Sequence, residues 1–248
     1  MTDLAKLSWT GVEALLARGC AAILPVGATE AHGPHLPLDT DVTIALGMSR
    51  RAATTLQARG QAAVVLPPLA YSLTDWAAPF SGTLGLTADE ARTLLLAVLR
   101  GAARTGFRPL AIANGHLEAG HVAVLREVAA TIQEETGVPV AFPDVTRRRL
   151  AERLTDEFRS GACHAGRYEG SLVLADDPQS VDDDAAAKLP PVNNSLVDAH
   201  RAGAQNFVEA GGPLAYFGAP AEASAEEGRA TFELLATMLV ESIDEVSS

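Results

Sequence analysis

The stretch CAAILPVG, residues 20–27, decides the fold class of this chain. It is apolar at almost every position and too short for a surface helix, which is typical of a strand buried on both faces of a parallel sheet. We expect three further strands from runs of the same kind: AAVVLPPL at 62–69, PLAIANG at 109–115 and VPVAFPD at 138–144.

Amphipathic stretches lie between these runs, at residues 42–59, 87–105 and 119–136. Their apolar positions recur at three- and four-residue spacing, which predicts helices. In the second stretch Thr87 can cap the start, Glu90 completes a capping box and Gly106 can end the helix. A closing helix is expected over roughly 222–245. Alternating strands and helices predict an α/β fold, a three-layer α/β/α sandwich with a mostly parallel central sheet.

Composition limits the class of protein and the partners to expect. The chain has 248 residues, 48% of them apolar, so we expect one domain spanning residues 1–248. A net charge of −12 leaves no basic footprint for a nucleic acid. The longest apolar runs fall far short of a bilayer span, so no membrane partner is expected. Cys20 and Cys163 cannot form a disulfide framework, which suits the cytoplasm.

Side chains able to bind metal gather directly after the first strand. The loop ATEAHGPHLPLDTD, residues 28–41, holds Glu30, His32, His35, Asp39 and Asp41. Residues two apart on an extended backbone point to the same side, so Glu30 and His32 can reach one pocket. The short carboxylate of Asp41, at the start of the next helix, can bridge two cations.

A second loop, NGHLEAGH at 114–121, follows the third strand, and its His116 and Glu118 repeat the two-residue spacing. The carboxyl ends of parallel strands meet at one edge of a sheet, so we expect both loops to form one site. Carboxylate and imidazole ligands together suit Zn²⁺, Mn²⁺ or Fe²⁺ better than Ca²⁺. Each residue alone could be an ordinary hydrogen-bonded loop residue, but together they predict a metal site, which can be dinuclear.

Three motifs together resemble the creatininase family, also called creatinine amidohydrolases. They are PVGATEAHGPHLPLDTD at 25–41, NGHLEAG at 114–120 and HAGRYEGS at 164–171. The resemblance implies an α/β/α sandwich with two divalent metal ions per chain, Zn²⁺ favoured over Mn²⁺ or Fe²⁺. It also implies a homo-oligomer, with a hexamer favoured, that hydrolyses carbon–nitrogen bonds in cyclic amides, formamides or peptides.

The family pattern also implies the metal ligands: Glu30 and His116 for one ion, His32 for the other, and Asp41 between them. One more ligand has two candidates. Creatininase proper uses the glutamate of the second motif, which corresponds to Glu118, whereas the wider family uses that of the third motif, which corresponds to Glu169. We favour Glu169, which leaves Glu118 as a catalytic or substrate-facing carboxylate.

His164, at the start of the third motif, has two interpretations. Its family position makes it a catalytic acid and base that protonates a leaving nitrogen. Alternatively, it only orients a ligand. Cys163 is a weaker candidate, as a nucleophile, because sequence neighbours rarely point at each other. The motifs also depart from the family: NGHLEAG lacks the usual second glycine, and segment 140–163 has no tryptophan, which argues against creatinine as the substrate.

We therefore expect a metal-dependent amidohydrolase that cleaves a carbon–nitrogen bond of a small-molecule substrate: a cyclic amide, a formamide or a modified peptide. One alternative is a metal-dependent hydrolase that opens a polyol-derived ring ketone or lactone. Another is a non-catalytic, metal-stabilised oligomer, whose metal would have no open coordination position. Specificity is expected in loops 71–86 and 190–220. The first of these is either a substrate wall or a subunit contact.

Overall fold

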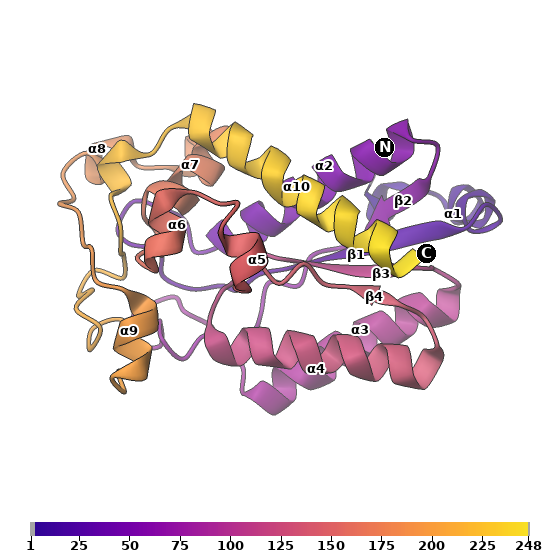
Figure 1. Cartoon of the computed structure of the whole chain (residues 1–248), viewed down its shortest axis with the longest axis horizontal. Coiled ribbons are helices and arrows are strands. Elements are labelled where there is room, and N and C mark those ends of the chain that lie inside the picture. The colour runs from indigo at the N-terminus through magenta and orange to yellow at the C-terminus, as the bar shows by residue number, and fades with distance from the viewer. Residues whose placement is uncertain (1–2, 248) are drawn as a thin grey trace.

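The computed structural model describes residues 3–247. Four parallel strands form its central sheet in the order β2-β1-β3-β4. They are β1 (Cys20–Val26), β2 (Ala62–Val65), β3 (Leu110–Asn114) and β4 (Val140–Ala141). Helices cover both faces of this sheet (Figure 1), so the predicted α/β/α sandwich is confirmed.

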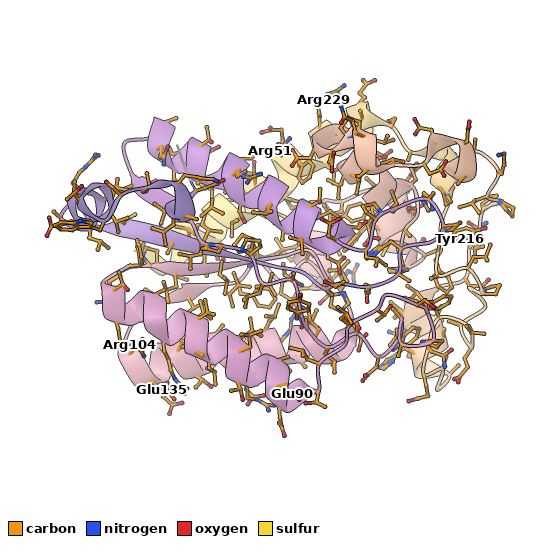
Figure 2. The ribbon with its side chains drawn as sticks, turned by 180° about the vertical axis from the view of Figure 1, so that it is seen from behind. Arg51, Glu90, Arg104, Glu135, Tyr216 and Arg229 are labelled. Atoms are coloured by element: carbon orange, nitrogen blue, oxygen red, sulfur yellow. The ribbon has the colours of Figure 1, made fainter. Side chains whose placement is uncertain are left out.

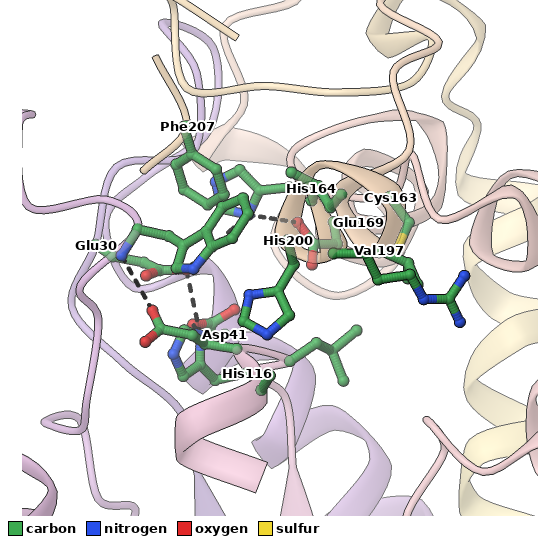
Figure 3. A pocket seen from close by; sticks show the side chains of 15 residues that line it. Glu30, Asp41, His116, Cys163, His164, Glu169, Val197, His200 and Phe207 are labelled. Carbon is green, nitrogen blue, oxygen red and sulfur yellow. Dashed lines mark hydrogen bonds and ion pairs between the residues drawn. The ribbon is translucent and has the colours of Figure 1, made fainter. Parts of the chain in front are cut away.

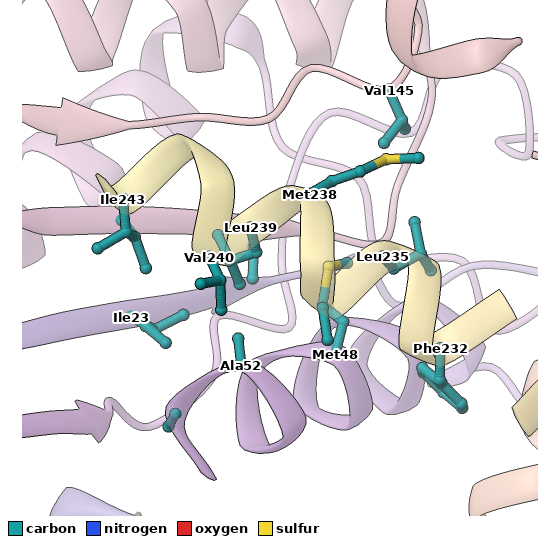
Figure 4. Packing of buried hydrophobic residues seen from close by; sticks show 14 of the residues in the cluster. Ile23, Met48, Ala52, Val145, Phe232, Leu235, Met238, Leu239, Val240 and Ile243 are labelled. Atoms are coloured by element: carbon teal, nitrogen blue, oxygen red, sulfur yellow. The ribbon is translucent and has the colours of Figure 1, made fainter. Parts of the chain in front are cut away.

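Two apolar layers enclose the sheet. One contains α2 (Thr40–Ala58), α7 (Arg167–Asp176) and α10 (Ala225–Ser247), and the other contains α1 (Trp9–Leu16), α3 (Ala88–Thr105) and α4 (Ala119–Thr136). Successive strand residues point to opposite faces, so Ile23 packs in the first layer and Leu24 in the second. Figure 4 shows α10 lying over α2, and the ring of Phe232 packs on α2 at Gly47.

The helix signals were accurate, whereas two strands are shorter than predicted. Thr87 and Glu90 form the capping box of α3, and Gly106 ends that helix with a φ of 103°. The second strand stops at Val65 and the fourth contains only two residues. Prolines explain both differences: Pro67 and Pro68 follow one strand, and Pro139 and Pro143 flank the other, and proline cannot donate a ladder hydrogen bond.

Short elements lie beyond the carboxyl ends of the strands. They are α5 (Arg148–Ala151), α6 (Asp156–Ser160), α8 (Asp183–Ala186), α9 (Leu196–Arg201) and the 3₁₀ turns Pro178–Ser180 and Pro220–Glu222. A further 3₁₀ turn, Leu4–Lys6, lies near the N-terminus. On the helical outer faces, charged side chains such as Glu90, Arg104 and Glu135 point outward (Figure 2). Within residues 3–247 no helix is both long and apolar enough to cross a membrane.

Two glycines let α2 begin directly against the ends of β1 and β3. A Cβ atom on Gly27 would lie 2.6 Å from the backbone nitrogen of Val42, and one on Gly115 would lie 2.1 Å from the carbonyl oxygen of Asp41. Any larger residue would push the helix away. This close approach places Asp41 at the carboxyl edge of the sheet, where the loops after β1 and β3 meet.

Candidate metal centre

Six metal-capable side chains from separate parts of the chain converge at this edge, and Figure 3 shows all of them except His32. They come from the loop after β1, the first turn of α2, the loop after β3 and the start of α7, and all of them are buried: Glu30, His32, Asp41, His116, His164 and Glu169. The sequence analysis expected the loops after β1 and β3 to meet at one edge of the sheet, whereas His164 and Glu169 were added through the family resemblance. The burial of all six side chains together shows that the loops do meet.

Asp41 is the centre of this cluster. Its Oδ1 lies 3.2 Å from His32 Nε2, and its Oδ2 lies 3.1 Å from His116 Nδ1. Ligand atoms within 4.8 Å of one another form three overlapping groups: Glu30, Asp41 and His116; His32, Asp41 and Glu169; and Glu30, His32 and His164. Asp41 is shared by the first two groups, with one oxygen toward each histidine.

Backbone carbonyls fix which nitrogen of each histidine faces Asp41. His116 Nε2 lies 2.7 Å from the Leu73 carbonyl oxygen, and His32 Nδ1 lies 3.1 Å from that of Glu30. A carbonyl oxygen only accepts, so these nitrogens must donate. In the neutral imidazole the other nitrogen then carries a lone pair, and in both residues that nitrogen points at Asp41. This arrangement is typical of metal-binding histidines.

The electrostatics of the cluster call for positive charge. Burial lowers the pKa of His32, but the carboxylates of Asp41, Glu169 and Glu30 more than reverse this and hold that pKa well above its usual range. Burial, with the charges of Asp41 and Glu30, raises the pKa of Glu169. The buried carboxylates therefore need a cationic partner, which can be a protonated imidazole or a metal ion.

Atoms without a hydrogen-bond partner indicate that a metal ion suits the cluster. Among the buried side-chain atoms of the described chain, Glu30 Oε2, His32 Nε2 and Asp41 Oδ2 have none. Such atoms are costly unless something else satisfies them. Mixed oxygen and nitrogen donors of this kind fit Zn²⁺, Mn²⁺ or Fe²⁺. The residues present thus fit a divalent cation.

The two rival glutamates occupy different places. Glu169 Oε2 lies 3.6 Å from His32 Nε2 and accepts a hydrogen bond from the backbone nitrogen of Ala165. Glu118 belongs to none of the three groups found among residues 3–247. Its Oε2 accepts a hydrogen bond from the backbone nitrogen of Trp76, at 3.2 Å, and burial raises its pKa to about 7. The geometry favours Glu169 as the ligand.

His164 is held in one orientation beside the cluster. Its Nε2 donates to the Ala31 carbonyl oxygen at 2.9 Å, and the ring of Phe207 stacks on it with centroids 4.1 Å apart. Its Nδ1 is then an acceptor, 3.9 Å from Glu30 Oε1. Burial and the neighbouring His32 hold the pKa of His164 well below its usual range, which keeps the imidazole neutral.

Three residues considered from the sequence stand apart from the cluster. Asp39 is exposed, and His35 is buried but belongs to none of the groups within residues 3–247. Cys163 lines the neighbouring cavity, but burial raises the pKa of its thiol, which argues against a thiolate nucleophile. Cys20 is also a free thiol, as expected.

A cavity of about 250 Å³ lies against the cluster. Glu30, Asp41, His116, His164 and Glu169 form one side of it. The remaining lining residues are Leu117, Glu118, Ala119, Cys163, Trp76 of loop 71–86, Phe207, and four residues of α9, Leu196, Val197, His200 and Arg201. Trp76 fits the substrate-wall interpretation of its loop. The α9 residues and Phe207 lie in loop 190–220, where specificity was expected, but the sequence analysis named none of them individually because no motif marks them.

The comparisons with known proteins agree with this geometry. The family model for creatininase, described as creatinine amidohydrolase, matches residues 5–243. The chain is 34% identical over 216 residues to a mycofactocin precursor peptide peptidase of Mycobacterium ulcerans strain Agy99, with 85% of this chain and 79% of that protein covered. It is 32% identical over 202 residues to a creatinine amidohydrolase of Pseudomonas putida, with 75% of this chain and 76% of that protein covered.

The chain belongs to the creatininase family. A crystal structure of creatinine amidohydrolase superimposes with a TM-score of 0.79 and 26% identity, over 100% of this chain and 98% of that one. The resemblance seen in the three motifs is therefore confirmed, and the protein is a hydrolase that acts on carbon–nitrogen bonds.

Metal-containing members of the creatininase family share this fold. A manganese creatininase is similar with a TM-score of 0.71 and 26% identity, over 100% of this chain and 99% of that one. A mutant creatininase of the Zn-Zn type is similar with a TM-score of 0.69 and 25% identity, over 99% of this chain and 98% of that one. The candidate ligands described above thus lie in a fold that holds metal in relatives.

Proposed function

We propose that this protein is an amidohydrolase that binds two divalent cations and cleaves the carbon–nitrogen bond of a cyclic amide, a formamide or a modified peptide. We also propose that it is a single-domain, cytoplasmic protein that acts on a small molecule as a homo-oligomer, with a hexamer favoured. The two named relatives act on a precursor peptide and on creatinine, and both substrates contain carbon–nitrogen bonds.

The geometry of Asp41 supports two cations over one. One ion would be held by Glu30, Asp41 and His116, and the other by His32, Asp41 and Glu169. Zn²⁺ is our first choice, with Mn²⁺ or Fe²⁺ as alternatives, because the donors mix imidazole and carboxylate. When bound, such a pair lowers the pKa of water and polarises a substrate carbonyl.

His164 would transfer the proton that hydrolysis has to move from water to the departing nitrogen. Its Nδ1 is an acceptor on the cluster side, so it can take a proton from the attacking water and pass it to the departing nitrogen. The Ala31 carbonyl and the stacked Phe207 ring hold the imidazole in place while it does so. Trp76 and Leu117 give the same cavity an apolar lining.

The observation that carries the proposal is the cavity itself. Four of the candidate ligands, Glu30, Asp41, His116 and Glu169, line one side of a 250 Å³ space and are not enclosed on all sides by protein. A purely structural metal site would be closed, whereas catalysis requires access for the substrate. This feature argues against the non-catalytic alternative. The departures from creatininase proper, notably the absence of tryptophan in 140–163, argue for a substrate other than creatinine.

The test combines elemental analysis of the purified protein with a hydrolysis screen. The screen contains creatinine, hydantoins, N-formyl amino acids, short peptides and a sugar lactone. We expect up to two transition-metal ions per chain and turnover of at least one amide class. A protein without metal that stays inactive after Zn²⁺ or Mn²⁺ is added would contradict the proposal, and turnover of the lactone alone would favour the ring-opening alternative.

A further inference from the structure

The wall of the cavity opposite the metal ligands comes from a single short helix, α9. In Figure 3, Val197 of α9 lies across the pocket from Glu30, and the ring of His200 lies between them. Leu196 and Val197 make this wall apolar on one side, while His200 and Arg201 bring hydrogen-bond donors to it. Neither polar residue has a role in the proton transfer or in metal binding described above.

The position of α9 is coupled to the segment that carries His164. The backbone nitrogen of Leu196 donates to the Gly161 carbonyl oxygen at 2.8 Å, and Ser195 caps the helix by accepting a hydrogen bond from the backbone nitrogen of Asp198. Leu196 also packs on the apolar cluster that contains Phe207, whose ring lies on His164. The α9 wall therefore has a fixed place relative to the catalytic histidine.

Both donors on α9 are available to a ligand. Within residues 3–247 the side chain of His200 makes no hydrogen bond, and its ring packs on that of Trp76 with centroids 5.9 Å apart. Arg201 pairs only with Asp198, one turn earlier on the same helix, and both side chains are 75% exposed. Exposed pairs of this kind contribute little, so a ligand can replace Asp198 at small cost.

The charges that line the cavity indicate which ligand fits. Four carboxylates face it, from Glu30, Asp41, Glu118 and Glu169, and among the described lining residues Arg201 is the only lysine or arginine. Two divalent cations would offset all four carboxylates. Arg201 then adds positive charge at the wall away from the metals, in a protein whose net charge of −12 otherwise repels anions.

We propose that Arg201 forms a recognition subsite for a carboxylate group of the substrate, with His200 beside it contacting a neighbouring part of the same substrate. The guanidinium of Arg201 pairs with the two carboxylate oxygens, since its planar donors match them. The ring of His200, which lies between Val197 and Glu30, donates a hydrogen bond to a polar group of the substrate nearer the ligand cluster. The apolar part of the substrate lies against Val197 and Trp76. This inference rests on the proposed function and narrows it: the preferred substrates are amides that carry a free carboxylate on the side remote from the metals.

Matched pairs of probes test the subsite. One pair is N-formylphenylalanine and its C-terminal amide, and the other is hydantoin-5-acetic acid and its amide. For each probe kcat/KM is measured with the metal-loaded protein, and binding is measured from the emission of Trp76 in a Trp9→Phe background, since these are the two tryptophans of the chain. The binding readout does not depend on turnover.

We expect the protein to favour at least one acid over its amide by tenfold or more. Arg201→Gln should weaken binding of that acid by about ten- to a hundredfold, as loss of a charged hydrogen bond does, and leave its amide within about twofold. Arg201→Lys should recover part of the loss and His200→Gln should cause a smaller one. Arg159→Gln is the matched control, because Arg159 also pairs with an aspartate three residues earlier, Asp156, but does not line this cavity.

The outcomes separate the subsite from the chemistry. Equal binding of acid and amide in both pairs, equal losses for both probes in Arg201→Gln, or the same loss in Arg159→Gln would overturn the subsite. If no amide is hydrolysed but an acid still binds in a manner that depends on Arg201, the subsite stands and the proposed hydrolysis fails. If amides are hydrolysed with no dependence on Arg201, the hydrolase stands and the subsite fails.

Discussion

The carbonyl oxygen of Asp41 lies 2.1 Å from the position that a Cβ atom on Gly115 would occupy. The first turn of α2 and the loop that carries His116 are therefore in direct backbone contact. This contact, more than any side-chain interaction, sets the distance between the aspartate and the histidine that share a metal in our proposal.

Gly115→Ala should therefore weaken metal binding. The added methyl group must push Asp41 and His116 apart, so we expect the affinity for Zn²⁺ to fall by at least about tenfold, in the range seen when the surroundings of metal ligands are altered. Competition with a chelator measures it. Gly101→Ala is the control: it lies within α3 with no atom closer than 3.9 Å to the new methyl group, so it should leave affinity unchanged and stabilise the helix by about 0.5–1 kcal/mol.

Glu118 and Glu169 should differ sharply when each is replaced by glutamine. Glu169→Gln should remove about one metal ion per chain and abolish turnover, because Glu169 faces His32. Glu118→Gln should keep the metal and lower kcat/KM by about ten- to a hundredfold, because Glu118 contacts Trp76 and the cavity. Metal content and kinetics of both variants decide the assignment, and the reverse pattern would make Glu118 the ligand.

His164→Gln should separate proton transfer from metal binding. If His164 is the acid and base, turnover of an amide should fall by about a hundred- to ten-thousandfold while metal content stays the same. Loss of metal in this variant would instead make His164 a ligand, as its proximity to Glu30 and His32 allows. A lactone substrate, whose leaving group needs less help from a proton donor, should show a smaller loss.

Light scattering at micromolar concentration should show a homo-oligomer. The prediction rests on the family resemblance and on apolar side chains exposed on loop 71–86, Tyr71 and Leu84, which are about half exposed in the single chain. A mass of six times 25.8 kDa would match the favoured hexamer. A monodisperse species near 25.8 kDa would rule out the prediction.

The parts of the fold that depend on local signals could be predicted from the sequence. The capping box at Thr87 and the stop at Gly106 involve only neighbouring residues, so the bounds of α3 were nearly correct. The conformation of loop 28–41 was harder to predict. The two-residue spacing placed Glu30 and His32 together, but it could not show that Gly33 adopts a φ of 65° or that His35 belongs to none of the ligand groups among residues 3–247.

Other features depend on packing between distant segments and left no local signal. Glu118 accepts a hydrogen bond from the Trp76 loop and belongs to none of the ligand groups among residues 3–247, which spacing within NGHLEAG cannot reveal. The position of α9 at the cavity likewise left no local signal in the sequence. His200 lies 36 residues after His164 in an otherwise unremarkable segment, and only tertiary contacts bring it to the cavity.

Metal content of the Asp41→Ala protein is the measurement that tests the central claim most directly. If Asp41 is shared by two cations, its loss leaves both under-coordinated, so we expect at most one ion per chain and no turnover, against up to two ions in the unmodified protein. Asp39→Ala is the control, because Asp39 is exposed two residues away and should change neither quantity. Full metal occupancy and unchanged turnover in Asp41→Ala would contradict the shared-ligand site.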